Sequence, residues 1–332
     1  MRPIVPFIIA LALVVGACGS DAAGEGPLIV YSGRTEDLVG PLFAAFEAET
    51  GIELEVRYAD STELAATLIL EGERSDADVF FAQDPASLGA VANAGLLAEL
   101  PADLVDRVPA RFSDTAGRWV GTSGRARTVV YNPDLVADGD LPESIWDLTD
   151  PRFAGLGVAP TNGSFLAFVA AMIVDEGEDR TLEWLQAIAA NAPISYPRNS
   201  PIVEAVDTGE IALGLVNHYY LLRLEAEQGS VVAANHFLGA GDAGSLVMPA
   251  GAGIMTGSDQ RGQAIELIEF LLSNEAQQHF ATETFEYPLI PGIAADPRLV
   301  PIDELSTPDI DLSRLADFLD KATELVTRAG LI

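Results

Sequence analysis

Residues 28–81 alternate between two spacings of apolar side chains, one typical of buried strands and the other of amphipathic helices. The strand patterns lie at residues 28–31, 52–56 and 77–81, and the helix patterns at residues 36–49 and around 62–70. Strands that alternate with helices in this way predict a parallel α/β unit. In open sheets of this class ligands bind at the carboxyl ends of the strands, which here fall at residues 32–36 and 82–84.

The rest of the chain also combines strand and helix patterns, and it contains no internal sequence repeat. We expect strands at residues 127–131, 156–159, 211–216 and 246–254, and helices at residues 165–175, 181–191, 262–280 and 312–328. No change in composition marks a linker, which favours two lobes joined by strands that cross twice, near residues 124–131 and 244–250. The predicted first lobe comprises residues 28–124 and 250–332, and the predicted second lobe residues 125–249.

The N-terminus has the pattern of a secretion signal. Arg2 precedes a short apolar run at residues 4–15, which is too short to span a membrane. The run ends in Val15-Gly16-Ala17-Cys18, which resembles the bacterial lipobox. This resemblance implies that residues 1–17 are removed, that Cys18 is acylated, and that residues 18–27 form a polar tether. The alternative is an ordinary signal peptide with a chance cysteine.

The net charge of −32, from 50 acidic and 18 basic residues, narrows the class of partner. Nucleic acids and anionic lipid surfaces repel such a chain, so we expect contact with the membrane through the lipid anchor only. No common catalytic motif is convincing. The match to a dinucleotide fingerprint at residues 239–244 precedes a strand that ends in Pro249, where the fingerprint requires a helix. We therefore expect no enzymatic activity.

The segment Asn217-His218-Tyr219-Tyr220 follows a predicted strand and carries the most informative chemistry. A free phenol loses its proton only near pH 10, so tyrosine is a poor ligand for most metals. A hard trivalent cation such as Fe(III) can displace that proton, whereas softer metals favour cysteine or histidine. Paired tyrosines can also simply pack in a core, which is their commoner use.

Twelve segments together resemble the family of bacterial periplasmic ferric-ion-binding proteins, the receptors of iron ABC importers. The resemblance covers roughly residues 28–290. It rests on LIVYSGR (28–34), FEAETG (46–51), ADVFF (77–81), AGLLA (94–98), GRARTVVYN (124–132), DP (150–151), PTNGSF (160–165), ANA (190–192), PRNS (197–200), GE (209–210), NHYY (217–220) and EYPL (286–289). It implies an α/β, two-lobed periplasmic-binding-protein fold of class II, in which the ligand lies between the lobes. The implied protein is a monomer that passes Fe(III) to a permease and an ATPase.

The resemblance also implies a ligand set. Tyr219 and Tyr220 match the family's adjacent iron-binding tyrosines, and Tyr131 matches a third tyrosine on the crossing strand. Some members hold a small anion such as carbonate or phosphate beside the metal. The residues that match its donors are Asn162, Gly163, Ser164, Asn199 and Asn217, with a fixed positive charge from Arg127 or Arg125.

The first lobe departs from the family pattern. Thr35-Glu36 stands where many members have histidine, and Gln83 stands where others have a glutamate ligand. Glu36 is the expected substitute and Asp84 a second candidate, although either could be a solvated loop acid. The alternatives are a receptor of the same fold for an anion, a polyamine or a sugar, and, more remotely, an enzyme or a surface adhesion lipoprotein.

Overall fold

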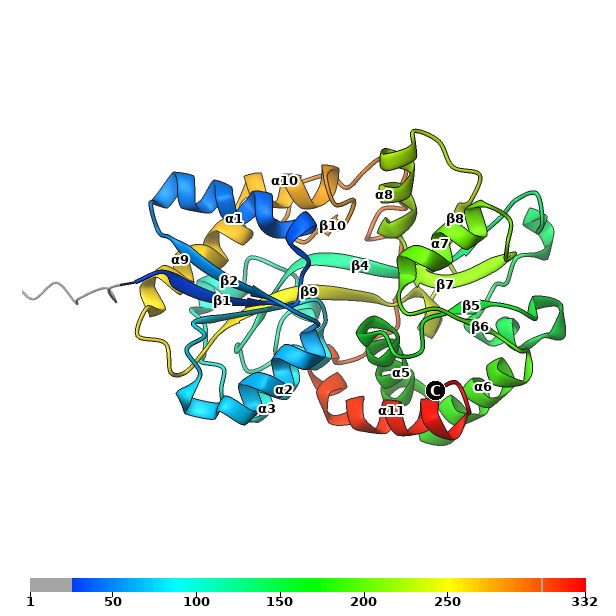
Figure 1. The fold of residues 1–332 in the computed structure, drawn as a ribbon, viewed down its shortest axis with the longest axis horizontal. Coiled ribbons are helices and arrows are strands. Elements are labelled where there is room, and N and C mark those ends of the chain that lie inside the picture. Colours follow the sequence, from blue (N-terminus) through cyan, green and yellow to red (C-terminus); the bar gives the residue numbers. More distant parts are fainter. Residues whose placement is uncertain (1–25, 306) are drawn as a thin grey trace, which may run out of the picture.

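The computed structural model describes residues 26–305 and 307–332, which form two lobes side by side (Figure 1). The predicted signal peptide, the acylated Cys18 and most of the tether lie outside the described residues. Within the described part of the chain, no helix is both long enough and apolar enough to cross a bilayer.

The first lobe is built on a parallel unit followed by antiparallel partners. Strand β1 pairs in parallel with β2 and β3, and β3 pairs antiparallel with β9. Its elements are β1 (Leu28–Ser32), α1 (Glu36–Thr50), β2 (Leu54–Tyr58), α2 (Ser61–Glu71), β3 (Val79–Ala82), α3 (Pro85–Asn93), α4 (Ala102–Val105), α9 (Arg261–Leu271) and α10 (Asn274–Thr282). The chain therefore leaves β1 and β3 at the same edge of the sheet, as the sequence pattern predicts.

The second lobe repeats the strand and helix alternation around β7. Strand β5 lies between β6 and β7 with parallel pairing on both sides. The elements of this lobe are β5 (Gly157–Val158), α5 (Gly163–Glu176), α6 (Glu178–Ala190), β6 (Ile194–Ser195), α7 (Asn199–Asp207), β7 (Leu213–Asn217), α8 (Tyr219–Gln228) and β8 (Ala234–His236). The helices α5, α7 and α8 all begin near the side of the second lobe that faces the first lobe (Figure 1).

Two antiparallel strands, β4 (Val120–Tyr131) and β9 (Val247–Ile254), connect the lobes. The first half of β4 pairs with β9 and with β10 (Tyr287–Pro288), whereas its second half pairs with β7 and β8. The chain crosses between the lobes along these two strands. Every residue of β9 and nearly every residue of β4 is buried, so the connection passes through the core.

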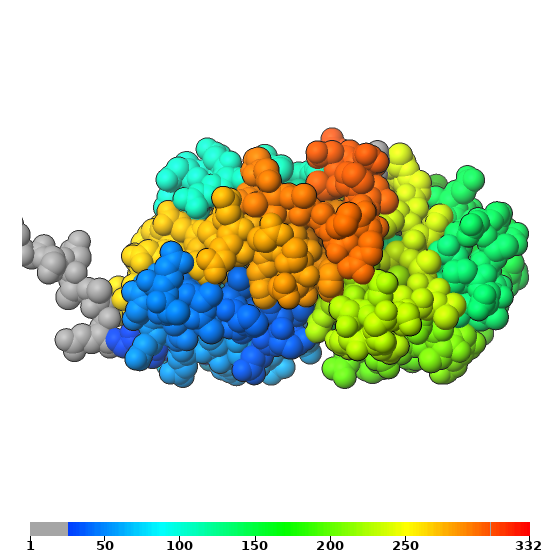
Figure 2. All heavy atoms as spheres, turned by 90° about the horizontal axis from the view of Figure 1, so that it is seen from above, coloured from blue at the N-terminus to red at the C-terminus, as the bar shows by residue number. Residues whose placement is uncertain are grey.

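The C-terminal segment contacts both lobes. Helix α11 (Leu319–Arg328) packs against α5 and α6 of the second lobe, and the preceding 3-10 helix η7 (Leu312–Phe318) contacts both α3 and α5. Figure 2 shows the chain after β10, in orange, lying over the junction between the lobes. The residues beyond about 290 therefore bridge the lobes and do not belong to the first lobe alone.

One long predicted helix is two helices. The pattern at residues 262–280 is interrupted at Ser273, whose hydroxyl accepts a hydrogen bond from the backbone N–H of Ala276 at 3.2 Å. This side chain caps the start of α10 and satisfies a donor that a continuous helix would have satisfied internally. Apolar periodicity continues across the break, which is why the pattern alone does not reveal it.

Candidate metal centre

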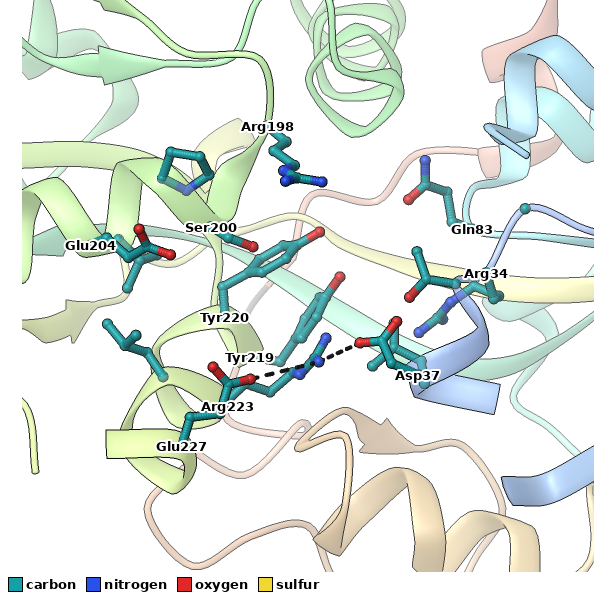
Figure 3. Close-up of a pocket in the computed structure, with 16 residues that line it drawn as sticks. Arg34, Asp37, Gln83, Arg198, Ser200, Glu204, Tyr219, Tyr220, Arg223 and Glu227 are labelled. Atoms are coloured by element: carbon teal, nitrogen blue, oxygen red, sulfur yellow. Dashed lines mark hydrogen bonds and ion pairs between the residues drawn. The ribbon is translucent and has the colours of Figure 1, made fainter. Parts of the chain in front are cut away.

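The two adjacent tyrosines are the first residues of α8, directly after β7 and His218. Their rings stack, with centroids 4.2 Å apart and planes 27° apart. Both hydroxyls point in the same direction, into the space between the lobes (Figure 3). Neither hydroxyl hydrogen-bonds to another described residue. A helix N-terminus also favours negative charge, so this position suits a phenolate.

The His218 side chain holds the start of α8 in place through contacts with the backbone of other segments. Its Nδ1 accepts a hydrogen bond from the backbone N–H of Ala126 at 3.0 Å, and its Nε2 lies 2.8 Å from the carbonyl oxygen of Phe285. The ring also packs against Tyr287, with centroids 4.8 Å apart. Burial lowers the pKa of His218 to about 4, so it is neutral near pH 7. The histidine therefore connects the start of α8 to the strand β4 and to Phe285.

A buried ion pair lies beside the tyrosines. Arg34 follows β1 and donates to both carboxylate oxygens of Glu286, with Nη1 3.2 Å from Oε2. Ser123 of β4 donates to the same carboxylate. Burial alone would raise the pKa of Glu286, but the Arg34 guanidinium outweighs it and holds that pKa below its usual value. The pair therefore stays ionised and, through Ser123, connects the loop after β1 to the strand β4.

The phenol of Tyr219 is strongly held in its protonated form. Burial raises its pKa well above 10, and the neighbouring Tyr220 raises it further. Arg34 and Arg125 act in the opposite direction, because a positive charge favours the phenolate. A ligand that binds this oxygen at pH 7 must therefore displace a proton, which requires a strongly polarising cation.

The residues predicted to bind an anion converge at the N-terminus of α5. Asn162 caps the helix, since its Oδ1 accepts from the Ser164 backbone N–H at 3.1 Å and from its hydroxyl at 2.6 Å. Asn199 lies 3.4 Å from the Ser164 hydroxyl, and Arg127 donates to Asn217 at 3.2 Å. Gly163 faces the first lobe, because a methyl group placed on it would lie 3.5 Å from the Gln83 amide nitrogen.

Two buried arginines on β4 retain donors without partners. Arg125 and Arg127 are each 1% exposed, and the Nε and Nη2 atoms of both have no hydrogen-bond partner within the described part of the chain. Burial lowers the pKa of Arg127 to about 9, while its guanidinium lies 5.1 Å from the Phe168 ring centroid. Buried donors of this kind are normally satisfied, so water or an anion is expected beside them.

The two tyrosines line a cleft of about 460 Å³ between the lobes. The first lobe contributes Arg34, Thr35, Asp37 and Gln83 to its walls, and the second contributes Arg198, Ser200, Glu204, Tyr219, Tyr220, Arg223 and Glu227. Asp37 on α1 and Arg223 on α8 form an ion pair of 2.5 Å across the cleft (Figure 3). A second contact of 2.5 Å joins Glu225 of α8 to Arg298 of the bridging segment.

Three candidate ligands lie elsewhere. Tyr131 is opposite Leu213 at the start of β7, whereas Tyr219 and Tyr220 follow the end of β7, so the length of that strand separates Tyr131 from the pair. The Tyr131 hydroxyl instead contacts Asp138 at 3.2 Å. Glu36 is exposed and does not line the cleft; the next residue, Asp37, lines it instead. Asp84 is buried, and its carboxylate caps α3 through Ser87.

Sequence reasoning did not assign a role to Arg34, Asp37, Arg198, Arg223 or Glu286. Arg34 and Glu286 lie inside the LIVYSGR and EYPL segments, so a signal was present. Each is a charged residue within an apolar segment, which predicts a buried pair. Their partnership spans 252 positions, and only the fold reveals it.

A family model described as bacterial extracellular solute-binding protein matches residues 75–312. The chain belongs to this family. Among its curated relatives, the "Fe(3+)-binding periplasmic protein" of Serratia marcescens is 32% identical, covering 100% of this chain and 98% of the relative. The "Major ferric iron-binding protein" of Neisseria meningitidis serogroup B is 31% identical, covering 96% and 98%.

A solved structure of the same family has the same fold. Iron-bound HitA from Pseudomonas aeruginosa superposes with a TM-score of 0.87 at 33% identity, covering 92% of this chain and 99% of HitA. This agreement confirms the predicted α/β periplasmic-binding-protein fold. As a solute-binding protein, the chain has its candidate site in the interlobe cleft, where the residues described above meet.

Proposed function

We propose that this solute-binding protein is the extracytoplasmic ferric-iron receptor of an ABC importer, and that Tyr219 and Tyr220 bind the iron as phenolates. The stacked pair at the N-terminus of α8, with both hydroxyls directed into the cleft, is the observation that carries this proposal. The names of the Serratia and Neisseria relatives specify Fe(3+), which supports the choice of metal. The permease and the ATPase of the importer are the expected partners.

The protein side chains alone do not complete an iron site. Within residues 26–305 and 307–332, no group of three or more histidine, cysteine, aspartate or glutamate side chains is placed to hold a metal. We propose that an anion with oxygen donors fills the remaining positions, supported by the polar cluster around Ser164 and Asn199. The dipole of α5, which begins at Gly163, also favours an anion there.

We also propose that the receptor is held at the membrane by acylation of Cys18. This proposal rests on the Val15-Gly16-Ala17-Cys18 sequence. Mass spectrometry of membrane-extracted protein should detect an acylated N-terminal cysteine and no residues 1–17. Secreted protein with a free Cys18 thiol would contradict this anchor without affecting the iron site.

Titration of the apoprotein with ferric iron tests the binding function. Iron bound by phenolates should produce a visible charge-transfer band that saturates at one iron per protein. Because two phenol protons are displaced, the medium should acidify on binding. The affinity should fall by about tenfold per pH unit for each proton released. A colourless complex, or binding that is independent of pH between 6 and 8, would argue against phenolate ligation.

A further inference from the structure

We infer that the C-terminal strap, defined as η7 and α11 together (residues 312–328), holds the interlobe cleft closed, and that the lobes separate only when η7 leaves α3. The strap contacts α3 of the first lobe and α5 and α6 of the second. In Figure 1 the strap is red and runs along the side of the molecule that these three helices form. This inference concerns the motion of the lobes and does not depend on which solute the cleft binds.

The helices α3 and α5 face each other across the cleft at their N-termini. Gln83 precedes Asp84, the N-cap of α3, and Gly163 is the first residue of α5. A methyl group on Gly163 would lie 3.5 Å from the Gln83 amide nitrogen and 3.7 Å from the Thr62 methyl group, so the lobes meet here. Opening the cleft about its hinge must separate these two helix ends. Because η7 contacts both helices, it cannot keep both contacts unchanged when the cleft opens.

The strap is attached to the second lobe along its whole length, because η7 packs on α5 and α11 packs on both α5 and α6. Helix α11 follows η7 directly and buries Ala322, Leu325 and Val326. Lys321 of α11 also lies 3.8 Å from the carboxylate of Glu178, at the start of α6. Removing three apolar side chains from water stabilises this attachment. The strap should therefore move with the second lobe when the cleft opens.

The contact between the strap and the first lobe depends on the absence of a side chain at Gly89 of α3. A methyl group there would lie 2.8 Å from Cβ of Ala316 and 3.3 Å from the carbonyl oxygen of Ser313, so the two helices approach each other closely. Asn93 on α3 also donates to Asp317 at 2.9 Å, in a hydrogen bond that is exposed to solvent. The contact is therefore maintained by close packing, which a single methyl group can disturb.

Small-angle X-ray scattering of the apoprotein tests this inference with the substitution Gly89→Ala. The added methyl group does not fit against Ala316, so η7 should leave α3 and the radius of gyration should increase. The affinity for ferric iron should fall by about tenfold, because fewer molecules are closed. Adding Ala316→Gly to Gly89→Ala should restore both values, since the nearest remaining atom lies 3.3 Å from the new methyl group.

The matched control is Gly262→Ala on α9, which makes the same glycine-to-alanine change inside a helix. Outside the backbone of its own helix, a methyl group at Gly262 would meet no described atom within 4 Å. The control should therefore leave the radius of gyration and the ferric affinity unchanged.

Should Gly89→Ala fail to fold, Ala316→Gly alone loosens the same contact by removing one methyl group, and it should also increase the radius of gyration. A radius and an affinity equal to those of the Gly262→Ala control, or a more compact protein, would overturn the inference, because η7 would then stay on α3 in the open protein as well. Scattering of the apoprotein needs no iron. Failure of every variant to bind iron would therefore reject the ferric function, while the radii would still decide whether the strap holds the cleft closed.

Discussion

Replacing Glu286 with glutamine should destabilise the apoprotein, because Arg34 would remain buried without its counter-ion. Arg34 is 2% exposed and Glu286 is fully buried. Removing one partner of a buried ion pair costs about 3–5 kcal/mol of the free energy of unfolding. For a domain of this size we expect a fall of about 10 °C in melting temperature, at roughly 2–4 °C per kcal/mol.

Differential scanning calorimetry of the apoprotein measures this effect. The control is Glu283→Gln, which alters an exposed glutamate in the same segment and should not move the transition. Replacing both partners with apolar residues, Arg34→Met with Glu286→Leu, should recover much of the lost stability, since no unpaired charge remains.

The pH dependence of the Glu286→Gln effect follows from the lowered pKa of Glu286. A carboxylate whose native pKa lies below its unfolded value contributes stability above the unfolded pKa, near 4.3 for glutamate. That contribution is lost as the pH falls through the native pKa. The gap between wild type and Glu286→Gln should therefore be full at pH 7 and shrink in acid. Equal melting temperatures at pH 7, or a gap that persists unchanged in strong acid, would refute this reasoning.

Two further predictions concern the first-lobe wall. Asp37→Asn should weaken ferric binding only modestly, by about two- to fivefold, because its partly exposed ion pair with Arg223 contributes roughly 0.2–1 kcal/mol. This loss of affinity should shrink at high salt, and it should not add to the loss caused by Arg223→Gln. Full additivity of the two losses would exclude a direct coupling across the cleft. Glu36→Gln should leave the affinity and the visible band unchanged, since Glu36 does not line the cleft, and a large loss would restore it as a ligand.

The fold could be predicted further than the site. Local apolar periodicity marks β1, α1, β3 and β7, because each element must bury one face whatever its partners. The sequence also places the tyrosine pair directly after a predicted strand, for the same local reason. The helix break at Ser273 and the packing of α11 on the second lobe depend on partners distant in sequence, which periodicity does not encode.

The structure places Glu36 and Tyr131 outside the walls of the cleft, and in each case a short offset along the chain decides the placement. Glu36 and Asp37 are adjacent, but consecutive residues on a helix point about 100° apart, as 3.6 residues per turn requires, so only one faces the cleft. Tyr131 lies on the correct strand but four residues beyond Arg127, which pairs beside Asn217. At about 3.3 Å per residue, that offset removes it by roughly 13 Å.

The central claim, that Tyr219 and Tyr220 supply phenolate ligands to iron, is tested most directly by removing one oxygen at a time. Tyr219→Phe and Tyr220→Phe each keep the stacked ring, and neither hydroxyl has a hydrogen-bond partner among the described residues, so the apoprotein should melt near the wild-type temperature. The matched control is Tyr131→Phe, which alters the last residue of β4, opposite the start of β7.

In a ferric titration followed by visible absorbance, each cleft variant should lose or blue-shift the charge-transfer band and bind iron weakly. The Tyr131→Phe control should retain the wild-type band and affinity. If Tyr219→Phe and Tyr220→Phe both keep the full band at wild-type affinity, the two tyrosines are core residues and the ferric assignment of this cleft is wrong.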